Sequence, residues 1–261
     1  MCGRFTSTTP PSVLAESFAV DELRLDDDLV PRWNVAPTLP VLAVAESRRN
    51  GARRLGTFRW GLVPRWAESP AVGSRMINAR AETVSTKPAY RDALVRRRCI
   101  IPADGFYEWK VIDGRPKQPY AIARRDGAPL AFAGLWDVWR DPNDTDAPPL
   151  QTCVIITTEA NERLAAIHHR MPVVLPAAAW DRWLDPSNQD VDALLALLVP
   201  APADDFVTWP VRLLVNKAAN EGPELIEPID DEESAAGGAG DGGSTATEDL
   251  QLDLLSPLVE D

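Results

Sequence analysis

The stretch RCIIPADGFYEWK, residues 98–110, decides the fold. β-Branched and aromatic residues fill its two halves, and these residue types are enriched in strands. Between the halves lies Ala103-Asp104-Gly105, whose Asp and Gly are typical of a turn. The stretch therefore predicts a strand, a turn and a second strand.

Strand-like segments continue on both sides of this stretch. They occupy 40–45, 54–63, 119–124, 130–139, 152–158 and 206–211. Helices are predicted at 11–20, 88–98, 159–166, 177–184 and 189–198. PRWNVAPT, residues 31–38, has too many turn residues for a regular element and predicts a loop. Many short strands without regular βαβ alternation predict an α+β fold: a single domain with a curved, barrel-like, mostly antiparallel sheet flanked by short helices.

The negative charge of the chain is concentrated at its carboxyl end. The formal net charge is -12, and residues 221–261 hold 13 Asp and Glu and no Lys or Arg. Of the 39 acidic and 27 basic residues of the chain, 26 and 27 therefore belong to residues 1–220. A nearly neutral body can present a basic cleft, so the overall acidity does not exclude a nucleic-acid partner.

The same asymmetry suggests where the folded part ends. We expect one domain over residues 1–228 and a disordered, acidic, low-complexity tail over 229–261, with Asp26-Asp27-Asp28 in a solvated loop. The tail ends in LQLDLLSPLVED, which mixes leucines with acids. It is a candidate for binding a protein partner, or for competing with a polyanion for a basic face. The simpler interpretation, which we favour, is a tail that only makes the chain more soluble.

Composition and cysteine usage indicate an ordinary soluble protein, 45% hydrophobic and 25% charged. No signal-peptide-like leader and no apolar run of membrane-spanning length is present, so we expect a cytoplasmic protein with the nucleoid as a workplace and no membrane partner. Cys2, Cys99 and Cys153 are an odd number without CxxC spacing, which favours a reducing compartment over disulfides or a zinc site. We expect no metal, no cofactor and a monomer.

The chemistry is expected at the amino end, where residues 1–5 read MCGRF. Met1 is readily removed because the next side chain is small, and Cys2 then carries an α-amine and a thiol on adjacent carbons. Unperturbed, these titrate near ~8 and ~8.5, so a fraction of each is nucleophilic at neutral pH. An aldehyde can form a Schiff base with the amine, after which the thiol closes a thiazolidine ring. The alternative reading is an incidental small residue at a frayed terminus.

Five further segments follow in order: WNVAPT (33–38), RWGLVPRW (59–66), INARAET (77–83), CIIPADGFYEWK (99–110) and IHHRMPVVL (167–175). With MCGRF, this set closely resembles the SOS-response-associated peptidase family of abasic-site-processing proteins over most of residues 1–228. The resemblance implies an enzyme that senses abasic sites in single-stranded DNA and shields them by joining its amino-terminal cysteine covalently to the sugar aldehyde. It also implies peptidase (hydrolase) activity, by which Met1 would leave, and lyase-like Schiff-base chemistry.

Four residues are expected to carry the reaction. Cys2 is the nucleophile. Glu108 lies among aromatic residues, where desolvation can raise its pKa, and the resemblance makes it the acid/base. Asn78 is implied to orient the nucleophile, and His168 matches the His-x-Arg-Met-Pro pattern of the family as a proton shuttle, although the family more often has an acidic residue at His169. On the residues alone, Glu108 is also read as a solvent-facing strand carboxylate and Asn78 as a turn residue.

DNA contacts are expected from arginines and aromatic side chains, which suit a groove that tolerates any base. The assigned set is Arg4, Asn34, Arg65, Trp66, Arg80 and Thr157, of which Arg65, Trp66 and Thr157 match contact positions of the family. Further candidates are Arg32, Arg96, Arg97, Arg98, Trp33 and Trp109, whereas Trp60, Trp136 and Trp180 are expected in the core.

Two other classes remain open from the sequence. An N-terminal-nucleophile glutamine amidotransferase also begins with a cysteine exposed by loss of Met1, but no glutamine-binding motif accompanies it here. A noncatalytic reader of modified DNA bases would use the aromatic groove and would not need Cys2.

Overall fold

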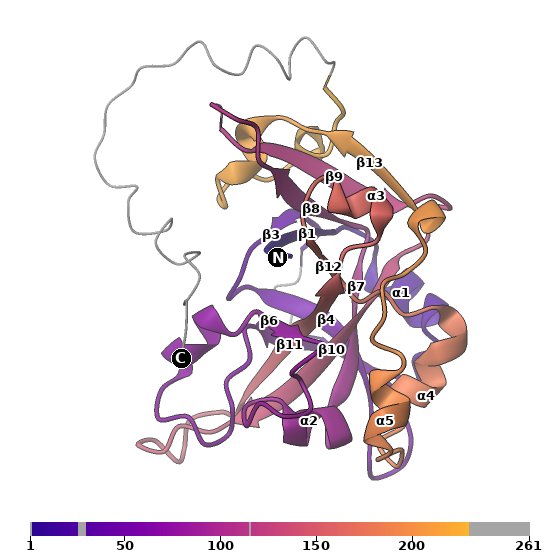
Figure 1. Ribbon diagram of the computed structural model, residues 1–261. Helices are drawn as coiled ribbons and strands as arrows, with labels where there is room; N and C mark the ends of the chain where they lie inside the picture. Colours follow the sequence, from indigo (N-terminus) through magenta and orange to yellow (C-terminus); the bar gives the residue numbers. More distant parts are fainter. Residues whose placement is uncertain (1, 26–29, 115, 230–261) are drawn as a thin grey trace.

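The computed structural model describes residues 2–25, 30–114 and 116–229 (Figure 1). Asp26-Asp27-Asp28 and all but the first residue of the predicted tail lie outside the described residues.

The strands form two sheets. The five-stranded sheet is antiparallel and contains, in spatial order, β13 (Phe206–Pro210), β9 (Gln118–Arg124), β8 (Gly105–Lys110), β1 (Arg4–Ser7) and β3 (Arg32–Val35). The larger sheet has the order β12 (Arg170–Pro172), β11 (Leu150–Glu159), β10 (Leu130–Trp139), β7 (Arg98–Ala103), β4 (Pro40–Glu46), β5 (Arg53–Trp60) and β2 (Glu22–Arg24). The short strand β6 (Asn78–Arg80) pairs with β11.

The larger sheet closes on itself. Besides its antiparallel partner β10, β11 pairs in parallel with β5, where Thr152 lies opposite Arg59 and Cys153 opposite Trp60. The strands β11, β10, β7, β4 and β5 therefore form a ring. This closure confirms the predicted barrel-like, mostly antiparallel α+β architecture.

Alternation along the barrel strands separates two hydrophobic clusters. On β4, Val41 and Ala43 join the cluster that includes Phe5 and Phe106 of the five-stranded sheet. Leu42 and Val44 join the other cluster, which the helices cover. The five-stranded sheet thus packs on one face of the barrel strands, and the helices pack on the opposite face.

The helices are shorter than the sequence predicts. They are α1 (Pro11–Ser17), α2 (Arg91–Arg96), α3 (Glu162–Ala165), α4 (Trp180–Leu184) and α5 (Val191–Leu195). Five 3₁₀ turns accompany them among the described residues: Pro70–Arg75, Ala177–Ala179, Ala203–Asp205, Leu213–Asn216 and Pro223–Leu225. The first and last residues of the predicted helices 159–166 and 189–198 are not helical. A short helix gains most of its stability from packing on the sheet, so residues outside that packing do not extend it.

The predicted strand-turn-strand at 98–110 is confirmed, but its turn joins the two sheets and does not close a hairpin. Asp104 separates β7 from β8, donates its backbone N–H to Thr6 O at 2.9 Å, and accepts hydrogen bonds from Thr8 and Thr9. A Cβ on Gly105 would lie 2.8 Å from Ile122 O, so only glycine fits where the strands of this corner approach.

The prediction of a loop over 31–38 is wrong at its centre. The chain there forms β3, in which Val35 pairs with Phe5 of β1 and the backbone N–H of Trp33 donates to Glu221 at 2.8 Å. The tertiary pairing partner overrides the local turn propensity.

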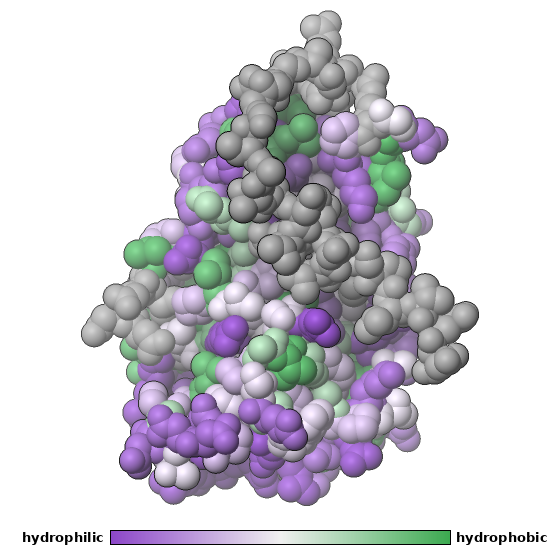
Figure 2. Space-filling view, turned by 90° about the vertical axis from the view of Figure 1, so that its left-hand side faces the viewer, coloured by the Kyte–Doolittle hydropathy of each residue, from purple (hydrophilic) through white to green (hydrophobic). Residues whose placement is uncertain are grey.

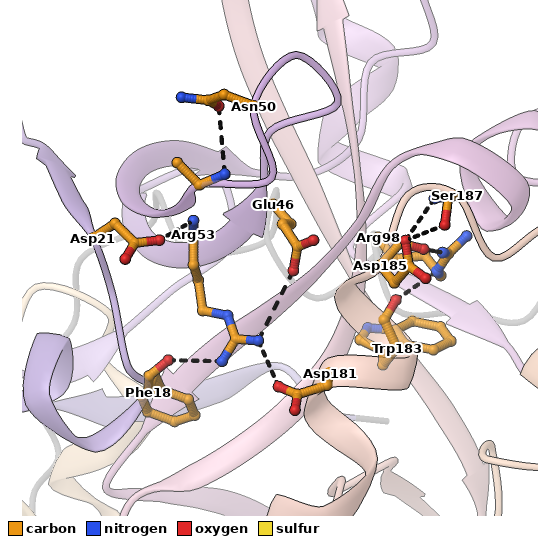
Figure 3. A network of polar contacts seen from close by, with 11 residues as sticks. Phe18, Asp21, Glu46, Asn50, Arg53, Arg98, Asp181, Trp183, Asp185 and Ser187 are labelled. Carbon is orange, nitrogen blue, oxygen red and sulfur yellow. Dashed lines mark hydrogen bonds and ion pairs between the residues drawn. The ribbon is translucent and has the colours of Figure 1, made fainter.

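Two arginines with little exposed surface connect helices to the barrel by hydrogen bonds and an ion pair, as Figure 3 shows. Arg53 of β5 donates to Phe18 O at 3.0 Å and to Asp181 at 2.6 Å. Arg98 of β7 donates to the backbone carbonyls of Leu94, Trp183, Asp185 and Asn188. Arg98 is 3% exposed, so its suggested role in contacting DNA is wrong. Its guanidinium instead satisfies the carbonyls at the ends of α2 and α4.

The surface is hydrophilic along the lower edge of the face in Figure 2, at the end of the molecule where Figure 1 places α2. Trp60 is fully buried, and Trp136 and Trp180 pack against the core as expected. None of the helices in the described part is long and apolar enough to cross a membrane.

Candidate active site

The amino end of the chain enters the centre of a sheet. Strand β1 pairs on one side with β8, where Arg4 lies opposite Tyr107, and on the other with β3. Cys2 lies two residues before the start of β1, packs in the inner hydrophobic cluster and is 0% exposed. Residues 2–5 therefore belong to the folded body of the protein and do not form a frayed terminus.

Asn78 of β6 contacts Cys2 directly. Its Nδ2 donates to the Cys2 backbone carbonyl at 2.9 Å. Its Oδ1 is buried and accepts no hydrogen bond from the described residues. Because β6 pairs with β11 and Ala79 packs in the cluster under the helices, Asn78 and Arg80 point to the opposite side, toward the amino end. An open acceptor therefore lies next to Cys2.

Glu108 of β8 is 4% exposed and follows Tyr107, which packs in a separate cluster on the other side of the sheet. Burial raises the pKa of Glu108, and the backbone N–H of Trp109 and the charge of Lys117 only partly oppose this. Burial and the nearby Glu108 carboxylate raise the pKa of the Cys2 thiol. The thiol is therefore protonated at neutral pH and needs a base to react.

His168 lies in the connection between α3 and β12. Its Nδ1 accepts a hydrogen bond from the Arg170 backbone N–H at 3.0 Å, and its ring stacks on His169 with centroids 4.4 Å apart. Burial lowers the pKa of His168 to about 4, and the charges of His169 and Lys117 act in the same direction. Nδ1 also lies 3.2 Å from the Arg170 carbonyl oxygen, so the Arg170 backbone can hold Nδ1 as an acceptor or as a donor. The ring is neutral at pH 7.

The depressed pKa of His168 makes stability depend on pH. The pKa of the His168 ring is about 6.5 in the unfolded chain and about 4 in the folded protein. Above pH 6.5 the ring is neutral in both states. Between pH 6.5 and 4 it is protonated in the unfolded chain and neutral in the folded protein, which favours unfolding. We therefore expect the melting temperature to fall as pH decreases from 6.5 to 4, and His168→Gln to reduce this fall. Thermal melts across that range test it. The control His169→Gln removes only a lesser cause of the lowered His168 pKa and should keep most of the fall. Equal pH profiles for both variants would contradict the assignment.

The predicted DNA contacts divide by exposure. The Trp66 side chain is 64% exposed, Arg80 is exposed, and the Arg65 side chain is 58% exposed while it pairs with Asp137 at 3.0 Å. Arg4 is partly buried and donates to Val215 O at 2.9 Å and to Asn34 Oδ1 at 3.1 Å. All four side chains are at least partly exposed to solvent, so a bound ligand could contact them.

Asn34 and Thr157 have no such surface, because both are 0% exposed. Asn34 Nδ2 donates to the carbonyls of Val215, Lys217 and Asn220. Thr157 Oγ1 lies 3.4 Å from both Ala79 O and the Arg170 guanidinium. A direct contact of these two residues with DNA does not fit the described conformation. Their place in the structure is to hold Arg4 and Arg170 in position.

The sequence reasoning missed two cationic residues at this site. Arg170 forms a two-pronged ion pair with Glu82, at 2.6 and 3.0 Å, and donates to Thr157 O at 2.7 Å. Lys117, between β8 and β9, is close enough to act on the pKa of both Glu108 and His168. Arg170 could have been found from the sequence, because it is part of the HRMP motif (169–172). Lys117 lies in no motif, so the sequence does not identify it.

Other candidates are accounted for by the fold. Trp109 donates from Nε1 to Asn216 Oδ1 at 2.7 Å, and Arg32 pairs with Glu221 at 3.3 Å. Within the described part of the chain, no group of three or more His, Cys, Asp and Glu side chains is arranged to hold a metal ion.

The fold and the site define a single-domain α+β protein whose own amino-terminal residues are built into the site. The model of the family described as SOS response associated peptidase (SRAP) matches residues 1–218. The chain belongs to this family, which confirms the resemblance found in the sequence.

Named relatives extend the match over the same region. The chain is 46% identical over 227 residues to the abasic site processing protein YoqW of Bacillus subtilis, covering 87% of this chain and 99% of the relative. It is 33% identical over 234 residues to the abasic site processing protein YedK of Escherichia coli, covering 88% and 100%. A crystal structure of a protein from Bacteroides thetaiotaomicron superposes with a TM-score of 0.75 at 26% identity, covering 87% of this chain and 100% of that one.

Proposed function

We propose that this protein processes abasic sites in single-stranded DNA by forming a covalent thiazolidine between Cys2 and the sugar aldehyde. The observation that carries the proposal is the contact of Asn78 with Cys2, which leaves the buried Oδ1 of Asn78 open beside the residue whose α-amine would be released. An amine N–H is a suitable donor for this acceptor, and the bond would orient the amine for attack. The names of the relatives supply the substrate class.

The reaction needs one acid and one base, and a single carboxyl group with a raised pKa can be both. The Cys2 amine adds to C1′ of the open sugar, and protonated Glu108 donates to the hydroxyl, which leaves as water. The Cys2 sulfur then attacks the resulting imine carbon, and its proton passes to the Glu108 carboxylate. One water is released in total. Because the imine is consumed, β-elimination and strand cleavage from it are prevented.

The remaining residues are assigned by position. Neutral His168 is the proposed shuttle between the sugar oxygens during ring opening, because the Arg170 backbone holds its Nδ1 and so orients the ring. Arg4 and Arg80 are proposed for phosphate beside the reacting sugar, with Asn34 and Thr157 supporting the site from the interior. Arg65 and Trp66 are proposed for phosphate and base stacking further along the strand.

Burial of Cys2 links the reaction to the removal of Met1. Cys2 is 0% exposed, and its nitrogen is bonded to Met1 in the sequence, so the α-amine becomes available only when Met1 has been removed. We propose self-processing: the thiol adds to the Met1 carbonyl carbon, the acyl group moves from nitrogen to sulfur, and water releases methionine. This step is the proposed peptidase activity, and the protein is proposed to act as a cytoplasmic monomer at the nucleoid.

The test uses the Met1-processed protein and a single-stranded oligonucleotide with one abasic site. We expect a band that survives denaturing electrophoresis, with a mass equal to protein plus oligonucleotide minus one water. A tetrahydrofuran analogue, which has no aldehyde, should give no band. Absence of the band with the true abasic site would contradict the proposal. Glutamine hydrolysis would favour an amidotransferase, and tight binding of modified bases without a band would favour a noncatalytic reader.

A further inference from the structure

A second concave site lies at the other end of the barrel. It is a pocket of about 630 Å³, which we call the arginine pocket. Arginines dominate its lining, together with two aromatic residues and one carboxylate. These residues are Arg24, Arg48, Arg49, Arg54, Arg65, Arg96, Arg97, Phe58, Trp136 and Glu46. Gln151, near the start of β11, also lines it. Thr157, which supports the candidate active site, is six residues further along β11. At about 3.4 Å per residue, Gln151 and Thr157 are roughly 20 Å apart along β11.

The charges in the arginine pocket are only partly neutralised. Arg65 and Arg97 share one carboxylate, Asp137, at 3.0 and 3.3 Å. Arg24 and Arg54 share Glu22 in the same way. Glu46 is the only carboxylate lining the pocket, and it lies 3.9 Å from Arg53. Each acidic group is thus shared between cations or directed to another arginine, and a positive excess remains.

Three further arginines of the pocket form no ion pair with an acidic side chain of the described residues. Within the described residues, the side chains of Arg48, Arg49 and Arg96 make no ion pair, and the Arg48 and Arg49 side chains are exposed at the turn between β4 and β5. Unpaired guanidinium groups gathered at one opening are an electrostatic site for a polyanion.

Aromatic rings form the floor of the pocket. Phe58 and Trp136 pack edge to face with centroids 6.0 Å apart, and Trp136 is only partly buried. A basic rim beside the partly exposed Trp136 ring suits a nucleotide, whose phosphates meet arginines while its base stacks. An acidic peptide would pair with the arginines but would offer no base to stack on the ring.

We propose that the arginine pocket is a second binding site for single-stranded DNA, which holds a nucleotide and its phosphates at a distance from Cys2. The inference rests on the proposed function, because the strand in the pocket would be the one that carries the abasic site. A separation of about 20 Å corresponds to roughly six nucleotides at the 3.4 Å rise of a stacked strand. A strand must therefore extend beyond the reacting sugar by about this length to occupy both sites.

The test compares Arg48→Gln/Arg49→Gln with wild type, using tetrahydrofuran oligonucleotides that bind without reacting. One has about three nucleotides on each side of the analogue and the other about ten, so only the longer reaches the pocket. Fluorescence anisotropy should show affinity for the longer strand reduced roughly tenfold, with a salt slope smaller by about 1.4. Affinity for the shorter strand, and the rate of cross-linking to a short abasic strand, should be unchanged.

The matched control is Arg124→Gln/Arg125→Gln, an adjacent pair at the end of β9 outside the pocket. It removes the same charge, so an equal loss of affinity in the control would overturn the proposal, as would equal losses for both strand lengths. A rise in affinity of the Arg48/Arg49 variant would mean that the pocket holds the acidic segment of this chain, and it would also overturn the proposal.

The two proposals fail separately. If wild type binds long strands through Arg48 and Arg49 but forms no cross-link, the pocket stands and the proposed reaction fails. If cross-linking occurs and the Arg48/Arg49 variant binds long strands as wild type does, the reaction stands and the pocket does not bind DNA.

Discussion

Protein carrying Cys2→Ala should give no adduct that survives denaturing electrophoresis, whereas wild type should convert the abasic oligonucleotide to a cross-link. Because the variant has no thiol for self-processing, an added aminopeptidase removes its Met1 before the assay. The variant keeps the α-amine of residue 2 and loses only the thiol. It can therefore form the imine but cannot close the ring. We expect the stable band to fall to background and strand cleavage to rise, because the unprotected imine permits β-elimination.

Borohydride distinguishes a missing thiol from a damaged site. Reduction during incubation should trap the Cys2→Ala imine as a stable band, since the amine and the residues around it are retained. The control Cys153→Ala removes another fully buried thiol, on β11, and should cross-link without borohydride as wild type does. A stable unreduced adduct of Cys2→Ala would disprove the ring-closing role of the thiol.

Glu108→Gln should slow cross-linking by about 10²–10⁴-fold, the usual contribution of a positioned acid or base, and leave noncovalent affinity for the tetrahydrofuran strand unchanged. The substitution keeps the shape of the side chain and removes its proton. Single-turnover rates from quenched gels measure the effect. The control is Glu159→Gln, an exposed carboxylate at the end of β11, which should react at the wild-type rate.

The pH profile of the wild-type rate should be bell-shaped. At low pH the amine is protonated and does not attack. At high pH Glu108 loses the proton that it must donate, and because its pKa is raised by burial this decline begins above the ordinary range of a glutamate. In Glu108→Gln the high-pH decline should disappear and the low-pH limb should remain. A variant profile that keeps both limbs would assign the acid to another group.

The sequence predicted the barrel strands well because each has a strong local signal. The segments at 40–45 and 130–139 are apolar and bounded by turns, and they form β4 and β10 nearly as predicted. The strand β3 was missed because the turn residues of 31–38 outweigh a short strand whose partners, β1, Glu221 and Tyr107 among them, are distant in the sequence. The corner at Asp104 could be predicted as a turn, but local sequence does not tell a turn between sheets from a hairpin.

Site residues that lie in a sequence motif could be predicted. Residues whose side chains can bind either a ligand or the protein backbone could not be assigned from the sequence. Arginine and asparagine bind phosphates and backbone carbonyls with the same groups, so sequence alone did not show that Arg98 and Asn34 are used inside the protein. Lys117 was missed because it reaches the site through the pairing of β8 with β9. The grouping of Cys2 with Asn78 depends on contacts between strands far apart in the chain.

The position of β1 has a consequence for maturation on the ribosome. The strand needs both β3 and β8 as neighbours, and β8 is more than a hundred residues downstream. At about 5–20 residues per second, the nascent amino end stays unpaired for roughly 5–20 s. During that interval a cellular aminopeptidase can trim the first residue. Once β8 has docked, Cys2 is fully buried, and the self-processing proposed above is the remaining way for a late chain to release its α-amine.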